Sequence, residues 1–338
     1  MMKFWKNTML FFLMLGCFSA AAQDIHFSHF FAAPFNTSPA QIGMFDGDYR
    51  FIVNQKTQWR SVTRPYSTFG FSFDMNNPFN RNDIAIGLGL FNDKTGDSEF
   101  NTLHIAPSIA YIFRPKTEKK QAFYLGLQPG FSNKRLDYTN LNYNNQYNGI
   151  AFDPNLPNNE NFQTEGLTYF NLNLGLGYEL KFDERKSLNA AVGWYNVNQP
   201  EQSFFNNNSI TLDRRFTFNT ELTYMLSESF DLLPSVKFFS QGTYREFVMG
   251  SRLRYYTNNL EGNISALYFG TWLRAGDAAF VHFGADYKNI QINVSYDINY
   301  SDLNIASRYR GGFEFSVIYI FKKFVPYNLR NRVCPEFL

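Results

Sequence analysis

The feature that most constrains this fold is a strict alternation of apolar and polar side chains that recurs along the chain. In residues 290–300, Ile, Val and Tyr alternate with Gln, Asn, Ser and Asp. Residues 170–182 repeat the pattern, with Phe, Leu and Tyr on one face and Asn, Gly, Glu and Lys on the other. Successive side chains of a β-strand point to opposite faces, so each run predicts a strand with one apolar and one polar face.

These runs are long enough to cross a membrane. Several exceed the roughly 9–11 residues that a tilted transmembrane strand requires. The chain contains 39 Phe and 21 Tyr, yet its mean hydropathy is only −0.33. A membrane barrel reconciles the two observations, because its lumen is polar while its lipid face is rich in aromatic residues. The sequence therefore predicts an all-β fold, a transmembrane antiparallel up-and-down β-barrel, and no transmembrane helix.

We expect about fourteen strands, an even number as in bacterial single-chain barrels. The alternating runs place them near 49–59, 66–76, 82–93, 99–114, 120–137, 166–182, 187–198, 212–226, 229–241, 244–257, 260–273, 277–287, 289–301 and 308–322.

The connections between these predicted strands alternate in length. Every second connection is short (NPFNR, PKTEK, DERK, SES, TNN and YKN), whereas the long segments 138–165 and 199–211 fall in the other set. Outer-membrane barrels have short periplasmic turns and longer external loops. The pattern predicts a protein of the bacterial outer membrane with both termini in the periplasm and the two long segments outside.

The first 22 residues have the parts of an export signal. Lys3 and Lys6 precede a short apolar run, which ends in small residues up to Ala22. We expect a signal peptide at 1–22 that is cleaved after Ala22. The alternative is lipidation of Cys17, which follows a partial lipobox.

Residues 23–48 combine aromatic side chains with prolines that interrupt regular structure. We expect this segment to be a periplasmic or plug segment that packs inside or beneath a barrel formed by 49–322, and 323–338 to be a basic periplasmic tail. Its aromatic cluster consists of His26, Phe27, His29, Phe30, Phe31 and Phe35.

The sequence lacks a pattern typical of catalysis or metal binding. A metal site needs clustered ligands, but of the four histidines only His26 and His29 lie close together in the sequence. An outer-membrane lipase with a Ser-His-acid triad would need its catalytic histidine on the lipid face of the barrel. Strand parity instead places His104 and His282 toward the lumen. We expect no catalytic, cofactor-binding or metal-binding residues, and a net charge of +2 gives no reason to expect nucleic acid as a partner.

Parity also places eight charged side chains in the lumen. They either pair with one another in the interior or form a polar conduit or a docking surface for a plug. They are Glu221, Lys237, Glu246, Arg252, Arg254, Asp286, Asp297 and Glu314.

Several segments resemble the PorP/SprF family of outer-membrane proteins, which is tied to type IX secretion and gliding motility in Bacteroidetes. QDIHFSHFFAAPFNTSPAQIG, GDYRFIVNQKTQW and PYSTFGFSFD are similar to its N-terminal signature. Further segments, including GLGLFNDKTGD, WLRAGDAAF, GGFEFSVIYIF and the closing CPEFL, extend the resemblance from Gln23 to Leu338. One departure is Ile25, which replaces the usual proline of a Gln-Asp-Pro pattern.

The resemblance implies an accessory barrel that supports the secretion or surface attachment of a large, adhesin-like protein through its C-terminal sorting domain. One alternative is a core component that links the outer membrane to the periplasmic ring of the secretion machine. Another is a passive channel for small or hydrophobic solutes. Other type IX components and outer-membrane lipids would be further partners.

Aromatic side chains in the long loops are our candidate cargo contacts, since aromatic residues dominate many protein interfaces. The alternative is an ordinary aromatic girdle at the membrane surface. The aromatic candidates are Tyr143, Tyr147, Phe152, Phe204 and Phe205, and Pro200 in the second loop is a further candidate. For a core component, the candidate periplasmic contacts are Cys334 and Phe337 in the tail.

Overall fold

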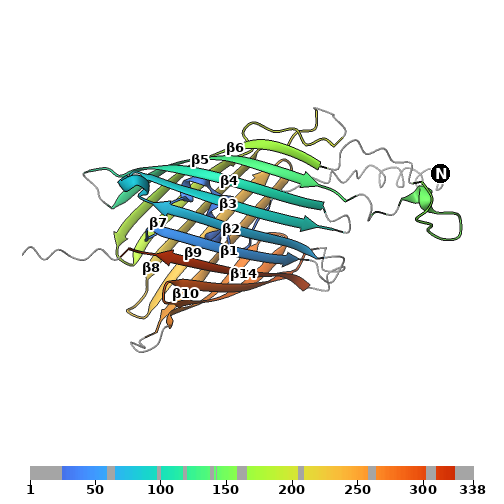
Figure 1. Ribbon diagram of the computed structural model, residues 1–338. Helices are drawn as coiled ribbons and strands as arrows, with labels where there is room; N and C mark the ends of the chain where they lie inside the picture. Colours follow the sequence, from blue (N-terminus) through green and yellow to red (C-terminus); the bar gives the residue numbers. More distant parts are fainter. Residues whose placement is uncertain are drawn as a thin grey trace, which may run out of the picture.

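A computed structural model describes residues 25–58, 65–96, 100–116, 120–137, 141, 143–157, 166–204, 209–257, 264–301 and 310–323. The predicted signal peptide, Phe205, and the tail with Cys334 and Phe337 lie outside these residues. Fourteen antiparallel strands form one closed barrel, in which each strand pairs with its sequence neighbours and β1 pairs with β14 (Figure 1). The predicted fold is confirmed.

The strands agree closely with the alternating runs of the sequence. Their bounds are β1 Tyr49–Gln58, β2 Tyr66–Asn76, β3 Ile84–Thr95, β4 Phe100–Phe113, β5 Gln121–Arg135, β6 Gly166–Asp183, β7 Lys186–Tyr195, β8 Arg215–Met225, β9 Phe230–Gln241, β10 Tyr244–Tyr256, β11 Ile264–Arg274, β12 Ala278–Tyr287, β13 Ile290–Asn299 and β14 Arg310–Phe321.

Strand β7 ends three residues earlier than predicted. Asn196 follows it with a φ of 55°, a left-handed conformation that cannot continue a strand. The Asn196 side chain donates to the backbone carbonyl of Asp213, so it ties the connection back to the next strand. The apolar pattern cannot reveal this turn, because it depends on a polar partner further along the chain.

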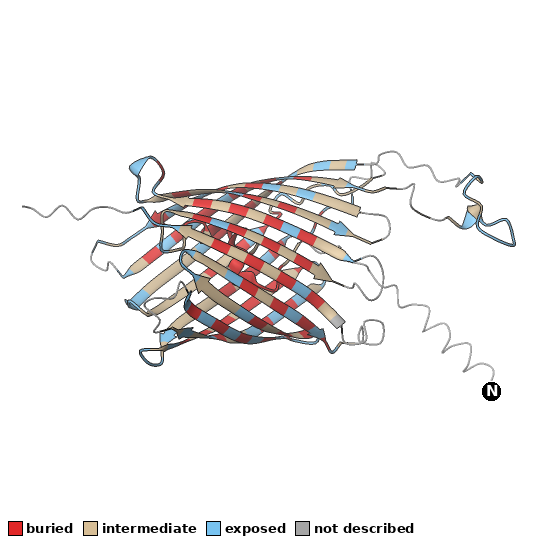
Figure 2. Cartoon of the chain, turned by 60° about the horizontal axis from the view of Figure 1, so that its bottom comes forward, coloured by how far each residue is buried: buried red, intermediate tan, exposed pale blue. Residues whose placement is uncertain are grey.

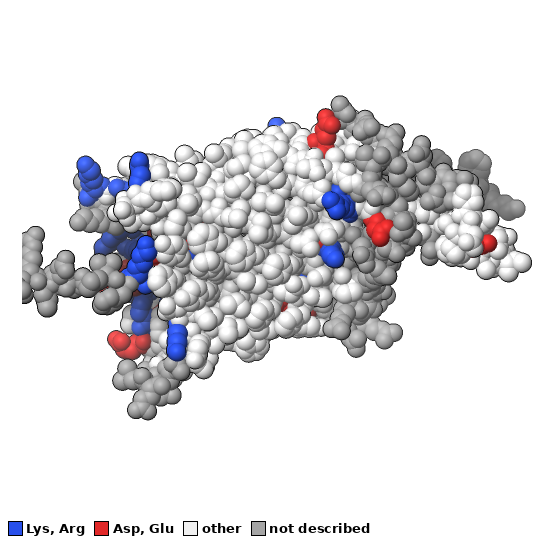
Figure 3. Space-filling view, in the orientation of Figure 1, with Lys and Arg blue, Asp and Glu red and all other residues white. Residues whose placement is uncertain are grey.

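The two faces of each strand have the predicted environments. In β6, Leu176 is 61% exposed on the outer face, whereas Asn173 is fully buried on the lumen face. Figure 2 shows the resulting stripes, in which buried and exposed residues alternate along the strands. In Figure 3, charged side chains gather toward the two ends of the barrel and leave a broad uncharged band between them. This band matches the apolar surface that a bilayer requires.

The barrel has two distinct ends. We call the end where β1 begins and β14 finishes the terminal end; Tyr49 and Phe321 are paired there. We call the opposite end the loop end; the lobe 143–157 projects from it (Figure 1). The β5–β6 and β7–β8 connections both lie at the loop end, as the alternating connection lengths predict.

Residues 25–48, which we call the lumen segment, lie inside the barrel in short turns. These are η1 (Phe30–Ala32), α2 (Pro34–Thr37) and η2 (Pro39–Gln41). Pro34 and Pro39 each occupy the first position of a helical turn, where the missing N–H has no cost. Two more short turns, η3 (Pro78–Asn80) and η5 (Asn144–Gln146), lie in connections. In the described part of the chain, no helix is both long and apolar enough to cross a bilayer.

The facing of the strands leads to a stability prediction. Leu174→Lys, in the middle of β6 on the lipid face, should cost about 2–4 kcal/mol of folding free energy. Thr102→Lys is the control, because Thr102 lines an open cavity inside the barrel and its substitution should be mild. Denaturant titration of both variants in lipid vesicles tests this. Equal losses would show that the strand faces are assigned wrongly.

Candidate functional site

The lumen segment runs along the barrel from one end to the other. Ile25 lines a cavity at the loop end together with Gln58, the last residue of β1. At the terminal end, the Asp48 N–H donates to the carbonyl of Phe321, and Lys323 N–H donates to the Asp48 carboxylate. The two ends of the described chain therefore lie at opposite ends of the barrel. The two chain termini, which the sequence predicts to be periplasmic, lie outside the described residues.

Glycines on the lumen face make room for the apolar side chains of this segment. A Cβ at Gly87 would lie 2.5 Å from the Phe35 ring, and a Cβ at Gly126 would lie 2.2 Å from the Pro39 backbone. Phe27 and Phe35 are buried there in the main apolar cluster. The small inward residues of runs such as IAIGLGLF thus line the part of the wall against which the lumen segment packs.

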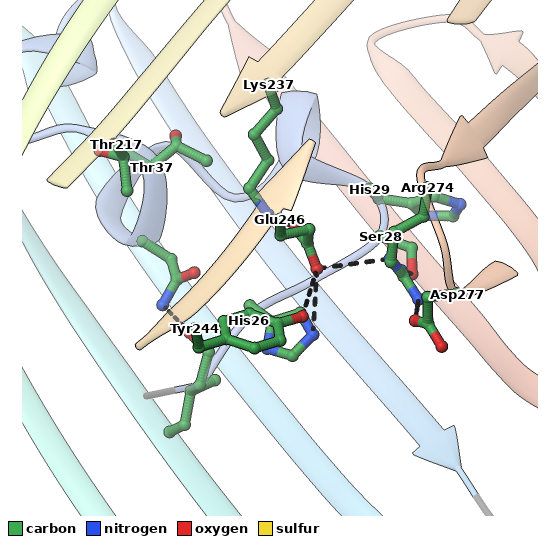
Figure 4. A network of polar contacts seen from close by, with 12 residues as sticks. His26, Ser28, His29, Thr37, Thr217, Lys237, Tyr244, Glu246, Arg274 and Asp277 are labelled. Carbon is green, nitrogen blue, oxygen red and sulfur yellow. Dashed lines mark hydrogen bonds and ion pairs between the residues drawn. The ribbon is translucent and has the colours of Figure 1, made fainter. Parts of the chain in front are cut away.

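Glu314 of β14 holds the backbone of the lumen segment. Its carboxylate accepts from the Ser28 N–H at 2.7 Å and from the His29 N–H at 2.8 Å. The Ser28 hydroxyl donates to Asp297 at 3.1 Å. It also accepts from Arg274 at 2.9 Å, and Figure 4 shows these two residues side by side. Side chains from β11, β13 and β14 therefore converge on two adjacent residues of the segment.

A second cluster centres on Glu246 of β10. Its carboxylate lies 3.0 Å from the Lys237 ammonium and 3.3 Å from the Arg274 guanidinium, and the Tyr244 hydroxyl donates to it (Figure 4). The ring of His26 lies 3.7 Å away. Buried charges need such partners, because an isolated ion inside a protein is costly. Among the predicted lumen charges, Lys237 and Glu246 are thus paired with each other, and Asp297 and Glu314 bond directly to the lumen segment.

At the terminal end, Asp74 fixes the point where the lumen segment leaves the lumen. It accepts from Arg50 at 2.7 and 2.9 Å and from the Gly43 N–H at 2.9 Å. Arg50 also donates to the Gln41 carbonyl at 3.1 Å. The segment is therefore held at both ends of its path by charge-assisted hydrogen bonds, which are stronger than neutral ones.

Of the two histidines of the lumen segment, His29 is fully buried and His26 is half-buried. His29 lies within hydrogen-bonding distance of the Ser316 hydroxyl, at 3.2 Å. No group of three or more His, Cys, Asp or Glu residues in the described ranges has the geometry to hold a metal ion.

A cavity of about 1190 Å³ lies between the lumen segment and the loop end. Phe35 and Asn36 of the segment form part of its lining. Its walls combine tyrosines, amides and charges of both signs, among them Tyr169, Asn171, His104, Lys134 and Asp277. Parity alone places several of these residues inward, but the cavity itself was not predicted, because its depth depends on where the lumen segment stops.

The predicted loop contacts fall into two groups. Tyr147 and Phe152 form an isolated β-bridge within the lobe and are 57% and 43% exposed, while Tyr143 is half-buried beside them. Phe204 packs edge-on against Phe100 at the end of β4, with ring centroids 6.5 Å apart.

In the β7–β8 connection, Pro200 is half-buried, and its carbonyl accepts from the Leu212 N–H. Sequence reasoning missed Ile150, which is 90% exposed between Tyr147 and Phe152 and could have been noticed as an apolar residue in a polar loop.

Two solved structures share this architecture. The toluene transporter TbuX of Ralstonia pickettii has 12% identity and a TM-score of 0.51, with 90% of this chain and 96% of that chain covered. The monoaromatic hydrocarbon channel CymD has 12% identity and a TM-score of 0.50, with 90% and 95% covered. At such identity the likeness shows the fold alone. A comparison with curated proteins gives no match.

The family assignment rests on the sequence along most of its length. The family model described as type IX secretion system membrane protein PorP/SprF matches residues 19–319, which include the lumen segment and all but the last two residues of the barrel. The closed barrel with an apolar outer band agrees with a membrane protein of secretion or transport. The chain belongs to the PorP/SprF family of type IX secretion system outer-membrane proteins.

Proposed function

We propose that this protein is an accessory barrel that supports the secretion or surface attachment of a large protein by binding its C-terminal sorting domain at the loop end. The observation that carries the proposal is the exposed aromatic pair Tyr147–Phe152, which the lobe 143–157 holds beyond the barrel. Rigid aromatic side chains provide large contact areas at low cost in conformational entropy, and they are frequent hot spots of protein interfaces.

The filled lumen also favours docking over passive transport. The lumen segment buries Phe27 and Phe35 against the wall, and its backbone is bonded to Glu314 and Asp74. A barrel that serves chiefly as a solute pore would keep an open path along its axis. A partner protein would instead meet this barrel from outside, at the lobe and at Phe204.

The proposal includes an orientation, with the loop end outside the cell and the terminal end in the periplasm. Peptide tags inserted in the lobe 143–157 or in 199–211 should then be labelled by antibody on intact cells. Tags at Glu184 or Glu228, in turns at the terminal end, should be labelled only after the outer membrane is opened. Labelling of Glu184 on intact cells would reverse the orientation.

Deletion of the gene should remove one large surface protein while general type IX secretion continues. Tyr147→Ser together with Phe152→Ser should reduce surface retention of that cargo, because both exposed rings are lost. Surface proteomics of intact cells measures the effect. Phe79→Ser is the matched control, since Phe79 is 90% exposed at the opposite end of the barrel and its loss should leave retention unchanged.

The same deletion separates the docking role from the core role. Loss of every cargo with a sorting domain would identify a core component of the secretion machine, and the cargo-docking proposal would then be wrong. In that case the periplasmic contacts to examine are Cys334 and Phe337, which the sequence nominates.

A further inference from the structure

A row of polar side chains crosses the wall of the loop-end cavity from β2 to β5. Thr68 of β2 pairs with Asp93 of β3, which pairs in turn with Thr102 of β4. Thr102 pairs with Lys134 of β5, and all four side chains line the cavity. Cross-strand partners on one face of a sheet are direct neighbours, so the row presents hydroxyl, carboxylate, hydroxyl and ammonium groups in that order.

A tyrosine lies on each side of this row. Tyr66 is the next inward residue of β2 beside Thr68 and lines the same cavity. Tyr169 of β6 lies on the other side, where the Lys134 ammonium is 5.4 Å from the centre of its ring. We call the four polar residues and these two tyrosines the wall site.

Charges of opposite sign nearly cancel around the cavity. Its described lining residues include four Lys or Arg and three Asp or Glu. Asp93 accepts from Thr68 at 2.5 Å. On the far wall, Arg274 lies 3.3 Å from Glu246 and 3.1 Å from Asp277. Such a lining offers little attraction to a strongly charged ligand, because attraction over distance requires an excess of one sign.

Two further classes of ligand fit this lining poorly. An apolar solute would displace water from hydroxyl and charged groups without replacing their hydrogen bonds, which is costly. An extended peptide commonly binds by adding to the free edge of a sheet, but all strands of this barrel are paired in a closed ring. The backbone of an entering peptide would therefore find no strand to pair with.

A neutral oligosaccharide matches the chemistry of the wall site. Sugar hydroxyls both donate and accept, so they can bond to a carboxylate, an ammonium group and other hydroxyls alike. The C–H faces of a sugar ring are apolar and can pack against the faces of tyrosine rings. The cavity of about 1190 Å³ exceeds the roughly 300–1,000 Å³ of a pocket for a drug-sized molecule, so it can hold several sugar rings.

We propose that the wall site binds a neutral oligosaccharide, whose rings pack against Tyr66 and Tyr169 while its hydroxyls bond to the polar row. The ligand would enter from the loop end, where the lining residues Arg245 and Gly276 are exposed. The wall site is separate from the proposed cargo contacts of the lobe 143–157, which projects beyond the barrel (Figure 1).

The test uses the purified full-length protein in lipid nanodiscs, without cargo, and a set of fluorescently labelled neutral tri- to pentasaccharides. Oligosaccharides of uronic acids and flexible peptides of matching length are measured in parallel. Fluorescence polarisation should show saturable binding of at least one neutral oligosaccharide and weaker binding of the acidic oligosaccharides and the peptides.

Separate variants test each part of the wall site. Tyr66→Ala and Tyr169→Ala should each weaken oligosaccharide binding by about fivefold, the usual value of one aromatic contact. Asp93→Asn keeps the shape of the side chain but removes its charge, and it should weaken binding by about tenfold, as for the loss of a hydrogen bond to a charged group. Thr102→Lys places a longer side chain in the middle of the row and should prevent binding.

Tyr111→Ala is the matched control. Tyr111 lies in β4, as Thr102 does, but it is 49% exposed on the lipid face, so its loss should leave oligosaccharide affinity unchanged. Heat-modifiable migration on a gel identifies the variants that have folded. Absence of binding by every neutral oligosaccharide would overturn the proposal. Full affinity in the Tyr66, Tyr169 and Asp93 variants would also overturn it, as would tighter binding of the peptides or the uronic acids.

Discussion

Deleting residues 25–47 should turn a closed barrel into a conducting pore. The lumen segment crosses the interior from the loop-end cavity to the terminal end and buries aromatic rings against β2 and β3. Barrels with sixteen or more strands leave an aqueous channel when they are empty, and those with about eight are filled by their own side chains. A fourteen-stranded barrel whose lumen face carries glycines opposite the segment should be open without it.

Planar-bilayer recording measures this directly. The intact protein should show no steady conductance, and the deletion variant should show discrete steps of constant size. Heat-modifiable migration on a gel should first confirm that the variant has folded. Deletion of the lobe 143–157 is the control, since it removes chain that lies outside the barrel and leaves the lumen segment in place. A deletion variant that is folded and silent would show that the lumen segment is not what closes the barrel.

Replacement of Glu314 by alanine should be the most destabilising single change that we predict, by about 3–5 kcal/mol, the usual cost of removing one partner from a buried charged pair. The change leaves the N–H groups of Ser28 and His29 without their acceptor. It also removes the carboxylate directly opposite Lys56, a buried ammonium on β1.

Chemical denaturation in lipid, together with limited proteolysis of the lumen segment, measures the effect. Glu314→Gln keeps the shape and one acceptor oxygen, so it should be milder than alanine. Asp83→Ala removes an exposed carboxylate from a surface ion pair with Arg81 at the terminal end and should have no measurable effect. If Glu314→Ala and Asp83→Ala behaved alike, the carboxylate would not be holding the segment.

The sequence predicted the barrel because alternation is a local property. In β13, each apolar residue from Ile290 onward is followed by a polar one, and the bilayer and the lumen impose that pattern regardless of the rest of the fold. The same reasoning placed His104 and His282 inward, as the structure finds. It also predicted that the aromatic segment 23–48 packs inside or beneath the barrel, and residues 25–48 are described inside it. The predicted strand ends are less accurate, because turns depend on individual residues. Strand β7, for example, stops before Asn196, whose left-handed backbone the alternating pattern does not reveal.

The candidate site was predicted only in part. The exposed aromatics Tyr147 and Phe152 were recognisable by composition, but their pairing across a bridge was not. The register of β4 against β5, in which Pro107 faces Pro129, is a clear example of the limit. Each proline is visible in the sequence, yet only the register of β4 against β5 brings the two face to face.

What the sequence determined by itself is therefore the number of strands, their facing and the presence of an apolar segment with no strand of its own. The tertiary structure decided the direction in which that segment crosses the lumen, the contact between Ser28 and Glu314 across 286 residues, and the depth of the loop-end cavity. The physical reason is that facing follows from the two solvents on either side of a strand. Pairing between distant residues follows from closure of the ring, which only the complete chain can specify.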